Sequence, residues 1–393
     1  MLNLYNFFPY STMKSPLVPI FLLFIVIILN SCSNKERHNS LSLFELTGKL
    51  DGGGEGMYIY LDRLTPDGII HVDSTIIAKG GLFSFHTAGI FKGFYNLRLT
   101  KDDFATLILD SNERVNLTGN GDNLGYTWAT TGSPDSKRFK ALNLESIEFK
   151  AALDSLQNRA QTIATAIGGN QRRLDSLNQA LEAPFDSIHS LHQRFIIKFI
   201  KDNVTYFSSI AAIQQLSPDS FLPYYIMLDS SLMINYPASL YTKHFHDEVN
   251  TFKRTAKGAT APDIDLTDAG GKAIRLSDLR GKTILIFFWN SGGKVSPASL
   301  VSTAQICSKF VKNNFAVYGV SFDRDKDAWL SAIKQYRLNW INVCDTAGGR
   351  SELFPLYNIR SLPYSVLIAP TGKIIDKGIK LEELEETIRN AVK

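Results

Sequence analysis

The residues best suited to chemistry in this chain of 393 residues are its three cysteines, Cys32, Cys307 and Cys344. Thiol chemistry needs a thiolate, and proteins favour one by pairing cysteines as Cys-X-X-Cys at a helix N-terminus, where the helix dipole lowers the thiol pKa. No such pair occurs in the sequence. The segment FFWNSGGKVSPASL, residues 287–300, has the surroundings of such a pair, because it links an apolar run to a predicted helix, but it lacks the thiols.

Other reactive side chains give weaker signals. The pairs His189/His192 and His244/His246 lie in amphipathic helical segments without a cysteine or carboxylate cluster, so we expect packing or solvated roles and no metal site. Lys294 beside Ser296 suggests a Ser-Lys nucleophile, but Ser296 before Pro297 is explained more simply as a helix cap. We expect no cofactor.

Composition limits the partners. The 42 basic and 38 acidic side chains nearly balance, and no run of Lys and Arg stands out, so a nucleic-acid partner is not indicated. The length exceeds what one hydrophobic core usually fills, which predicts several domains.

The N-terminus predicts export and a membrane anchor. Lys14 precedes an apolar run that ends at LNSC, Leu29 to Cys32, which resembles a bacterial lipobox. We therefore predict a lipoprotein signal peptide over residues 1–31, lipidation of Cys32, and a polar tether over 32–41. A plain secretory signal and an uncleaved anchor are the alternatives.

Hydrophobic periodicity divides the rest of the chain. Residues 42–125 alternate with period two between Gly-rich turns, which predicts an all-β domain, most simply a β-sandwich. Residues 133–255 have helical periodicity, broken at the GGN of 168–170, with a further run beginning after Pro184. Residues 258–393 combine buried strands with helices in the order βαβα then ββα, which is typical of a thioredoxin-like domain. The predicted class is multidomain α+β.

Residues 258–393 resemble the thioredoxin-like domain of TlpA-type thiol:disulfide oxidoreductases of the bacterial envelope, which are related to the AhpC/TSA group. The resemblance runs through APDIDL, LSDLRGK, FFW, LYNIRSLPYSVLIAPTGKII and the last helix. The layout also resembles Gram-negative lipoproteins with an N-terminal β domain of unknown function. The resemblance implies that the protein lies in the cell envelope, anchored to a membrane by a lipid, with its domains in the periplasm.

The resemblance places the redox motif on residues that cannot perform redox chemistry. Counted from Trp289, its two cysteines fall on Gly293 and Ser296, with Lys294 and Val295 between them. Glycine has no side chain to attack with, and an unactivated hydroxyl forms no disulfide. An acidic residue that many members carry would fall near Ser299 and is absent.

One part of the family site is retained. Pro363 matches the family's cis-proline, which leaves backbone groups of Leu362 free to pair with an extended substrate; the alternative is that Pro363 only shapes a turn. We expect Trp289 and Tyr364 to add apolar contact area to this groove.

The predicted function is binding of a protein, peptide or small ligand at the degenerate groove of a membrane-anchored envelope protein. The alternative is a thiol:disulfide oxidoreductase that uses Cys307 or Cys344. Cys307 lies inside a predicted helix and Cys344 near a strand end, which favours structural thiols. Spacing does not decide whether they pair.

Overall fold

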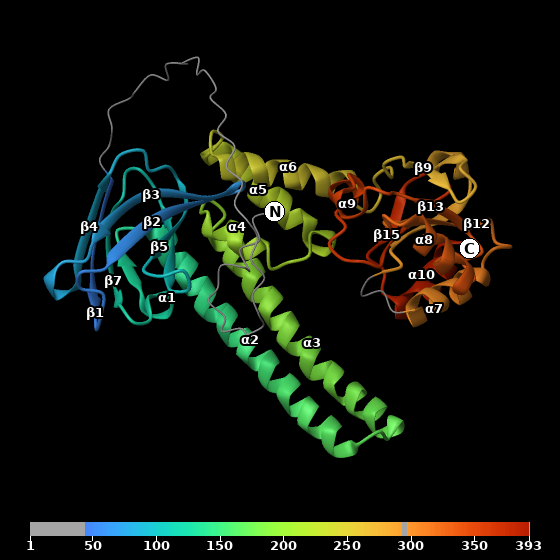
Figure 1. The fold of residues 1–393 in the computed structure, drawn as a ribbon, viewed down its shortest axis with the longest axis horizontal. Coiled ribbons are helices and arrows are strands. Elements are labelled where there is room, and N and C mark those ends of the chain that lie inside the picture. Colours follow the sequence, from blue (N-terminus) through green and yellow to red (C-terminus); the bar gives the residue numbers. More distant parts are fainter. Residues whose placement is uncertain (1–43, 293–296, 393) are drawn as a thin grey trace, which may run out of the picture. The chain divides into compact units, whose positions relative to one another are not determined.

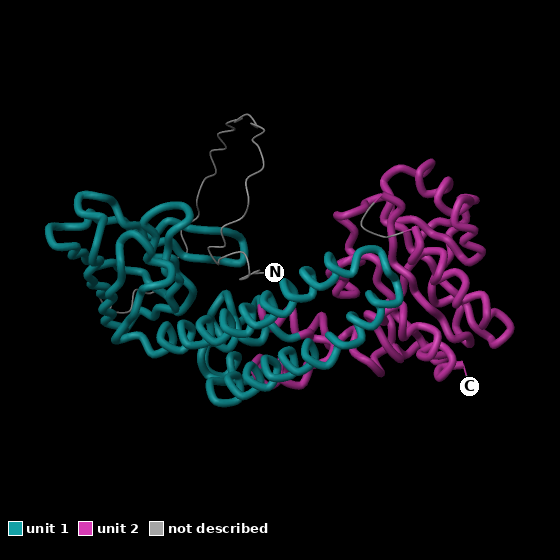
Figure 2. The backbone as a smooth tube through the Cα atoms, turned by 90° about the horizontal axis from the view of Figure 1, so that it is seen from below, with its two compact units in different colours: residues 1–216, 230–244 teal, residues 217–229, 245–393 magenta. Residues whose placement is uncertain are grey.

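The computed structural model describes residues 44–292 and 297–392. The chain divides into two compact units (Figure 2). The first runs to Leu216 and also takes Ser230–His244, and the second takes Ser217–Asp229 and Phe245 onwards. The predicted signal peptide and tether, with Cys32, lie outside the described residues, as do Gly293, Lys294, Val295 and Ser296.

The first unit begins with two four-stranded sheets, ordered β4-β1-β7-β8 and β3-β2-β5-β6 (Figure 1). Their strands are β1 (Phe44–Asp51), β2 (Tyr58–Thr65), β3 (Gly68–Ile76), β4 (Leu82–Thr87), β5 (Gly93–Arg98), β6 (Phe104–Leu109), β7 (Arg114–Asn120) and β8 (Ala129–Thr131). A short helix, α1 (Leu124–Thr127), precedes β8. All pairings in these sheets are antiparallel except that of β1 with β7.

Alternate residues of both sheets meet in one core. Phe44 and Leu46 of β1 belong to the same buried cluster as Ile59 and Leu61 of β2. Side chains in a strand point alternately to its two faces, so the period-two pattern puts one face of each sheet inside. This packing of two sheets on a shared apolar core confirms the predicted sandwich-like β domain.

Two long antiparallel helices follow, α2 (Pro134–Ile167) and α3 (Gln171–Asp202), which lie side by side (Figure 1). They are joined at the predicted break, where Gly168 has φ +62°, a left-handed conformation that glycine adopts without strain. The expectation of a separate helical run after Pro184 is wrong, because α3 continues through this residue. Pro184 interrupts one backbone hydrogen bond, but neighbouring turns continue the helix.

The remaining helices are α4 (Ser208–Ile213), α5 (Pro218–Asn235) and α6 (Leu240–Arg254). In the first unit, the outer face of the second sheet packs against helical residues: the Phe94 ring lies 6.1 Å from that of Phe139, 6.3 Å from Phe207 and 5.5 Å from Tyr241. α5 and α6 are each divided between the units: the first part of α5, up to Asp229, and the last part of α6, from Phe245, belong to the second.

The second unit is built on a seven-stranded sheet ordered β10-β9-β13-β12-β11-β14-β15. Its elements in chain order are β9 (Asp265–Asp268), β10 (Ala273–Arg275), β11 (Thr283–Trp289), α7 (Pro297–Ser308), β12 (Phe315–Ser321), α8 (Lys326–Gln335), β13 (Ile341–Cys344), α9 (Leu353–Tyr357), β14 (Tyr364–Ile368), β15 (Ile374–Lys377) and α10 (Leu381–Ala391). The central strands β13, β12 and β11 are parallel, and β14 and β15 add antiparallel pairs.

Apolar clusters cover both faces of this sheet. Phe288 contributes to one, with α9, and its neighbour Trp289 contributes to the other, with α7, α8 and α10. Every residue of β11 is buried, which explains its continuous apolar run. The arrangement confirms the predicted thioredoxin-like α/β domain and the mixed α+β class. Within residues 44–292 and 297–392, no helix combines the length and apolarity needed to cross a bilayer.

Candidate functional site

The candidate site lies where β11 ends and α7 begins. β11 ends at Trp289, and α7 starts at Pro297, the predicted first helical residue. The register pairs Phe288 with Tyr364, so Pro363 lies beside the end of β11. The Leu362–Pro363 peptide bond is cis. The structure therefore brings together Trp289 and the Leu362–Tyr364 segment, which lie more than 70 residues apart in the sequence.

The prediction that Trp289 adds apolar contact area to the groove is wrong. The side chain is fully buried and belongs to the apolar cluster under α7, α8 and α10. β11 is a central strand of the sheet, and the side chain of its last residue points into the core on the face that α7, α8 and α10 cover. Trp289 therefore supports the end of β11 from within.

Tyr364, which we expected to add apolar contact area to the groove, has a partner that the sequence did not predict. Its ring packs with the cluster on the α9 face of the sheet, opposite Trp289, and its hydroxyl donates to Asp219 Oδ2 at 3.3 Å. Asp219 Oδ1 also forms an ion pair with the buried Lys377 at 2.6 Å. This contact ties the start of α5 to β14 and β15 within the second unit, so Tyr364 has a structural partner. Of the expected groove residues, Leu362 is half-buried and Pro363 is exposed.

A buried carboxylate that the sequence analysis missed holds the loop after β11. Asp323 follows β12 and is only 8% exposed. It accepts hydrogen bonds from the Ser291 backbone nitrogen at 3.0 Å and the Ser291 hydroxyl at 2.8 Å, and from the Ser321 hydroxyl at 2.6 Å. Because β11 and β12 are parallel neighbours, their C-terminal ends meet at one edge, which brings Asp323 to Ser291. The signal was present in the sequence: an aspartate two residues after a buried strand.

The two remaining cysteines of the domain are free and poorly suited to attack. Cys307 is buried in α7, and burial raises the pKa of its thiol to about 12. Cys344 ends β13, where its thiol donates to the Asp323 carbonyl oxygen at 3.3 Å. Burial, with a smaller contribution from the carboxylates of Asp323 and Asp345, raises the pKa of Cys344 as well. A thiol with a raised pKa holds little thiolate at neutral pH.

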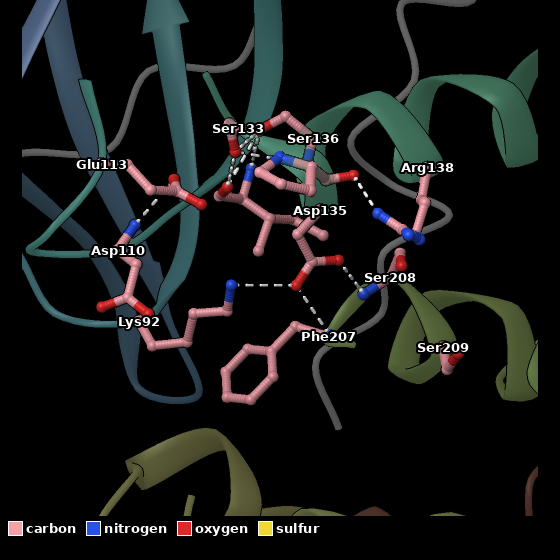
Figure 3. Close-up of polar contacts among 12 residues, drawn as sticks. Lys92, Asp110, Glu113, Ser133, Asp135, Ser136, Arg138, Phe207, Ser208 and Ser209 are labelled. Atoms are coloured by element: carbon pink, nitrogen blue, oxygen red, sulfur yellow. Dashed lines mark hydrogen bonds and ion pairs between the residues drawn. The ribbon is translucent and has the colours of Figure 1, made fainter. Parts of the chain in front are cut away.

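A second polar cluster, in the first unit, joins the β-sandwich to the helices (Figure 3). Lys92 Nζ lies 3.1 Å from Asp135 Oδ2, and both side chains are largely buried. Asp135 also accepts hydrogen bonds at 2.9 Å from the backbone nitrogens of Phe207 and Ser208, at the start of α4. Burial lowers the pKa of Lys92, but the attraction of Asp135, together with smaller contributions from Glu113 and Tyr236, outweighs it and the net shift is upward.

Glu113 lies in the same cluster. Burial raises the pKa of its carboxyl to about 7, although Lys92 and hydrogen bonds from Ser133 and the Asp110 backbone act in the opposite direction. Ser133 and Ser136 donate to the Ile108 carbonyl oxygen, at 2.8 and 2.9 Å. The hydroxyls are thus occupied by backbone groups, and the cluster is suited to holding α2 and α4 on the sandwich.

One histidine of each predicted pair has an ionic or aromatic partner. His246 pairs with Asp229 at 3.0 Å, and the ring of His192 packs on Phe149 with centroids 4.9 Å apart. Across the two described ranges, no group of three or more His, Cys, Asp or Glu side chains is placed to hold a metal ion.

The fold and the site geometry define a thioredoxin-like domain with a cis-proline beside the end of its central strand β11. Comparison with known proteins agrees: residues 257–377 match the AhpC/TSA family, and the chain belongs to this family through its C-terminal domain. Residues 44–139 match a domain of unknown function, DUF4369.

Relatives of the C-terminal domain are thiol-disulfide oxidoreductases. A solved thiol-disulfide oxidoreductase from Bacteroides fragilis is 34% identical, with 33% of this chain and 98% of that chain covered and a TM-score of 0.32. The thioredoxin domain of one from Bacteroides vulgatus is 29% identical, covering 35% and 99%, with a TM-score of 0.33. Thiol-disulfide oxidoreductase ResA of Bacillus cereus is 28% identical over 155 residues, 39% of this chain and 85% of ResA.

Proposed function

We propose that this protein is a lipid-anchored component of a Gram-negative cell envelope whose thioredoxin-like domain binds an extended protein segment and does not exchange disulfides. One observation carries the proposal: the two positions that the family motif assigns to cysteine are Gly293 and Ser296. Neither side chain can form the mixed disulfide through which exchange proceeds.

The other thiols do not replace the missing pair. Cys307 is buried in the domain core, and the pKa of Cys344 is raised by burial. Attack on a disulfide requires an accessible thiolate, so both residues are better suited to packing. The activity named for the relatives therefore does not transfer with the fold.

The groove next to the cis-proline supports a binding role. Pro363 is exposed and lies beside the end of β11, and β14 begins one residue later. Backbone groups that flank such a turn suit an extended segment that adds to the sheet by main-chain hydrogen bonds. Since Trp289 is buried and Tyr364 is engaged with Asp219, affinity at this groove comes mainly from the backbone around Leu362 and Pro363.

The proposed lack of disulfide exchange is tested by the reduction of insulin with dithiothreitol as electron donor. The chain from residue 33, which lacks Cys32, should give the rate of the donor alone. A Gly293→Cys, Ser296→Cys double variant is the matched control and should accelerate the reaction, because it restores two thiols at the start of α7. Turnover by the wild type that Cys344→Ser or Cys307→Ser abolishes would instead favour an oxidoreductase.

The anchor is tested in cells. Acylation of Cys32 should place the mature protein in the membrane fraction, because acyl chains supply the binding free energy. Cys32→Ala should leave unprocessed precursor or soluble protein. A variant that fractionates and migrates like the wild type would contradict the lipoprotein assignment.

The groove is tested with a partner captured by crosslinking in cells. Pro363→Ala and Ser296→Trp should each weaken its affinity at least about 10-fold, or about 1.4 kcal/mol, while Met57→Ser on the β-sandwich serves as a control. Unchanged affinity in both groove variants would place the binding surface elsewhere on the chain.

A further inference from the structure

Large apolar side chains are exposed at both ends of the β-sandwich. Met57, Tyr58, Ile76 and Leu82 lie at one end, and a second group lies at the end where β1 begins. Ile69 is 62% exposed and Phe91 is 64% exposed, and Ile70 is exposed as well. We call these three residues the end patch. Single exposed apolar residues are normal on a soluble protein, but a group of large ones marks a contact surface.

The three residues are neighbours in space although they come from two segments. Ile70 pairs with Arg63 across β2 and β3, and the Arg63 guanidinium lies over the Phe91 ring, 5.7 Å from its centroid. Ile69 pairs with Leu64 one position further along. Ile70 and Phe91 therefore lie beside Arg63, whereas Ile69 points to the opposite face of β3 at the same end, next to the turn between β2 and β3.

The chain enters the sandwich at this same end. Phe44, the first residue of β1, pairs with Thr87, the last residue of β4, and Phe91 follows four residues later. Glu45 pairs with Arg114 at the start of β7, so the beginnings of β1 and β7 and the end of β4 share this end. Phe44, the first described residue of the chain, thus lies at the end that carries the patch.

We propose that the end patch contacts the surface of a phospholipid bilayer, an inference that rests on the proposed lipid anchor. Eleven residues separate Cys32 from Phe44, and fully extended they span at most about 40 Å. A lipid at Cys32 therefore keeps this end of the sandwich near the membrane. Ile69, Ile70 and Phe91 enter the interface between headgroups and acyl chains, where apolar side chains gain free energy by leaving water.

The bilayer explains the chemistry of the patch better than a charged partner does. Its exposed side chains are apolar, and the two nearby cations have contacts within the protein: Lys92 pairs with Asp135, and the Arg63 guanidinium lies over the Phe91 ring. We therefore expect binding that depends weakly on salt and on the content of anionic lipid.

The test uses the chain from residue 33, which cannot be acylated, so failure of the anchor and failure of the patch are separate results. Co-flotation with vesicles of phosphatidylethanolamine and phosphatidylglycerol should show partitioning of the wild type. An Ile69→Ser, Phe91→Ser variant should partition at least about 5-fold less. The matched control Met57→Ser changes a side chain that is 45% exposed one residue before the opposite end of β2, and it should partition like the wild type.

Two outcomes overturn the proposal. Equal partitioning of the wild type and the double variant, including no flotation of either, would exclude contact between the patch and the bilayer. The second outcome comes from light scattering without vesicles. If the wild type is a dimer and the double variant is a monomer, a second copy of the chain covers the patch through the open edge of β3.

Discussion

The Asp323 carboxylate binds Ser291 twice, through the Ser291 backbone nitrogen and through its hydroxyl. Ser291 lies two residues after β11, and Asp323 lies two residues after β12. One buried side chain thereby fixes the first turn of the chain that leads from the central strand towards α7. The loop after β11 is thus held at Ser291, two residues before Gly293, the position where the resemblance predicts the family's first cysteine.

Replacing Asp323 with alanine should destabilise the second unit. The change removes the acceptor for the Ser291 and Ser321 hydroxyls and leaves buried donors without a partner, which costs about 2–3 kcal/mol. Urea unfolding followed by circular dichroism measures the loss. Asp327→Asn is the control, because Asp327 is exposed in the first turn of α8 and should cost about 0.5 kcal/mol or less. Equal stability of Asp323→Ala and the wild type would show that the contact contributes nothing.

Cys307 should be almost unreactive in the folded protein. Its pKa of about 12 leaves a thiolate fraction of roughly 10⁻⁴ at pH 8. In the chain from residue 33 with Cys344→Ser, Ellman's reagent should react at least about 100-fold more slowly in buffer than in guanidinium chloride. Rapid reaction of the native variant would mean that the α7 thiol is accessible, and it would revive the oxidoreductase alternative.

The sequence predicted elements whose signal is local. Alternating residues such as Phe44 and Leu46 defined strands, and the apolar run of β11 defined a buried one. The direction of Trp289 was mispredicted because β11 has two buried faces, so alternation does not show which residues reach the surface. Pro184 was mispredicted as a boundary, since packing of α3 on α2 outweighs the local cost of proline.

The candidate site was predicted only in part, because only its motifs are local signals in the sequence. The motif predicted the cis-proline Pro363, whose peptide bond is cis in the structure. Its assignment of Gly293 and Ser296 to the cysteine positions stays a prediction, because both residues lie outside the described ranges. The Ser291–Asp323 and Tyr364–Asp219 contacts join residues 32 and 145 positions apart. No periodicity links such positions, because only the strand order brings them together.

Asp135 should be among the most sensitive positions of the first unit. It is 1% exposed, pairs with Lys92 and accepts from two backbone nitrogens of α4. Asp135→Ala leaves a buried lysine without its counter-ion, which costs about 3–5 kcal/mol. The urea midpoint should fall accordingly, whereas Asp154→Ala, which removes an exposed ion pair with Lys150 on α2, should change stability by about 0.5 kcal/mol or less. Similar losses in both variants would refute a special role for the buried pair.

Glu113 should make the stability of the first unit fall as pH rises. Its folded pKa of about 7 lies above the ordinary value of 4.5, so the folded state binds the proton more tightly than the unfolded state. Protonation therefore favours folding, and this advantage is lost as pH rises from about 4.5 through 7. Because the carboxyl is partly exposed to solvent, the contribution should be on the order of 1 kcal/mol.

The measurement is the free energy of unfolding at pH 5 and pH 8 for the wild type and Glu113→Gln. Glutamine does not titrate, so the variant should lose less stability between the two pH values, and the difference between the proteins isolates the contribution of Glu113 from that of Lys92 and Asp135. Glu145→Gln, at an exposed position of α2, should follow the wild type at both pH values. If Glu113→Gln also follows the wild type, the carboxyl is already ionised throughout this range, and Glu113 adds no pH dependence to the cluster of Figure 3.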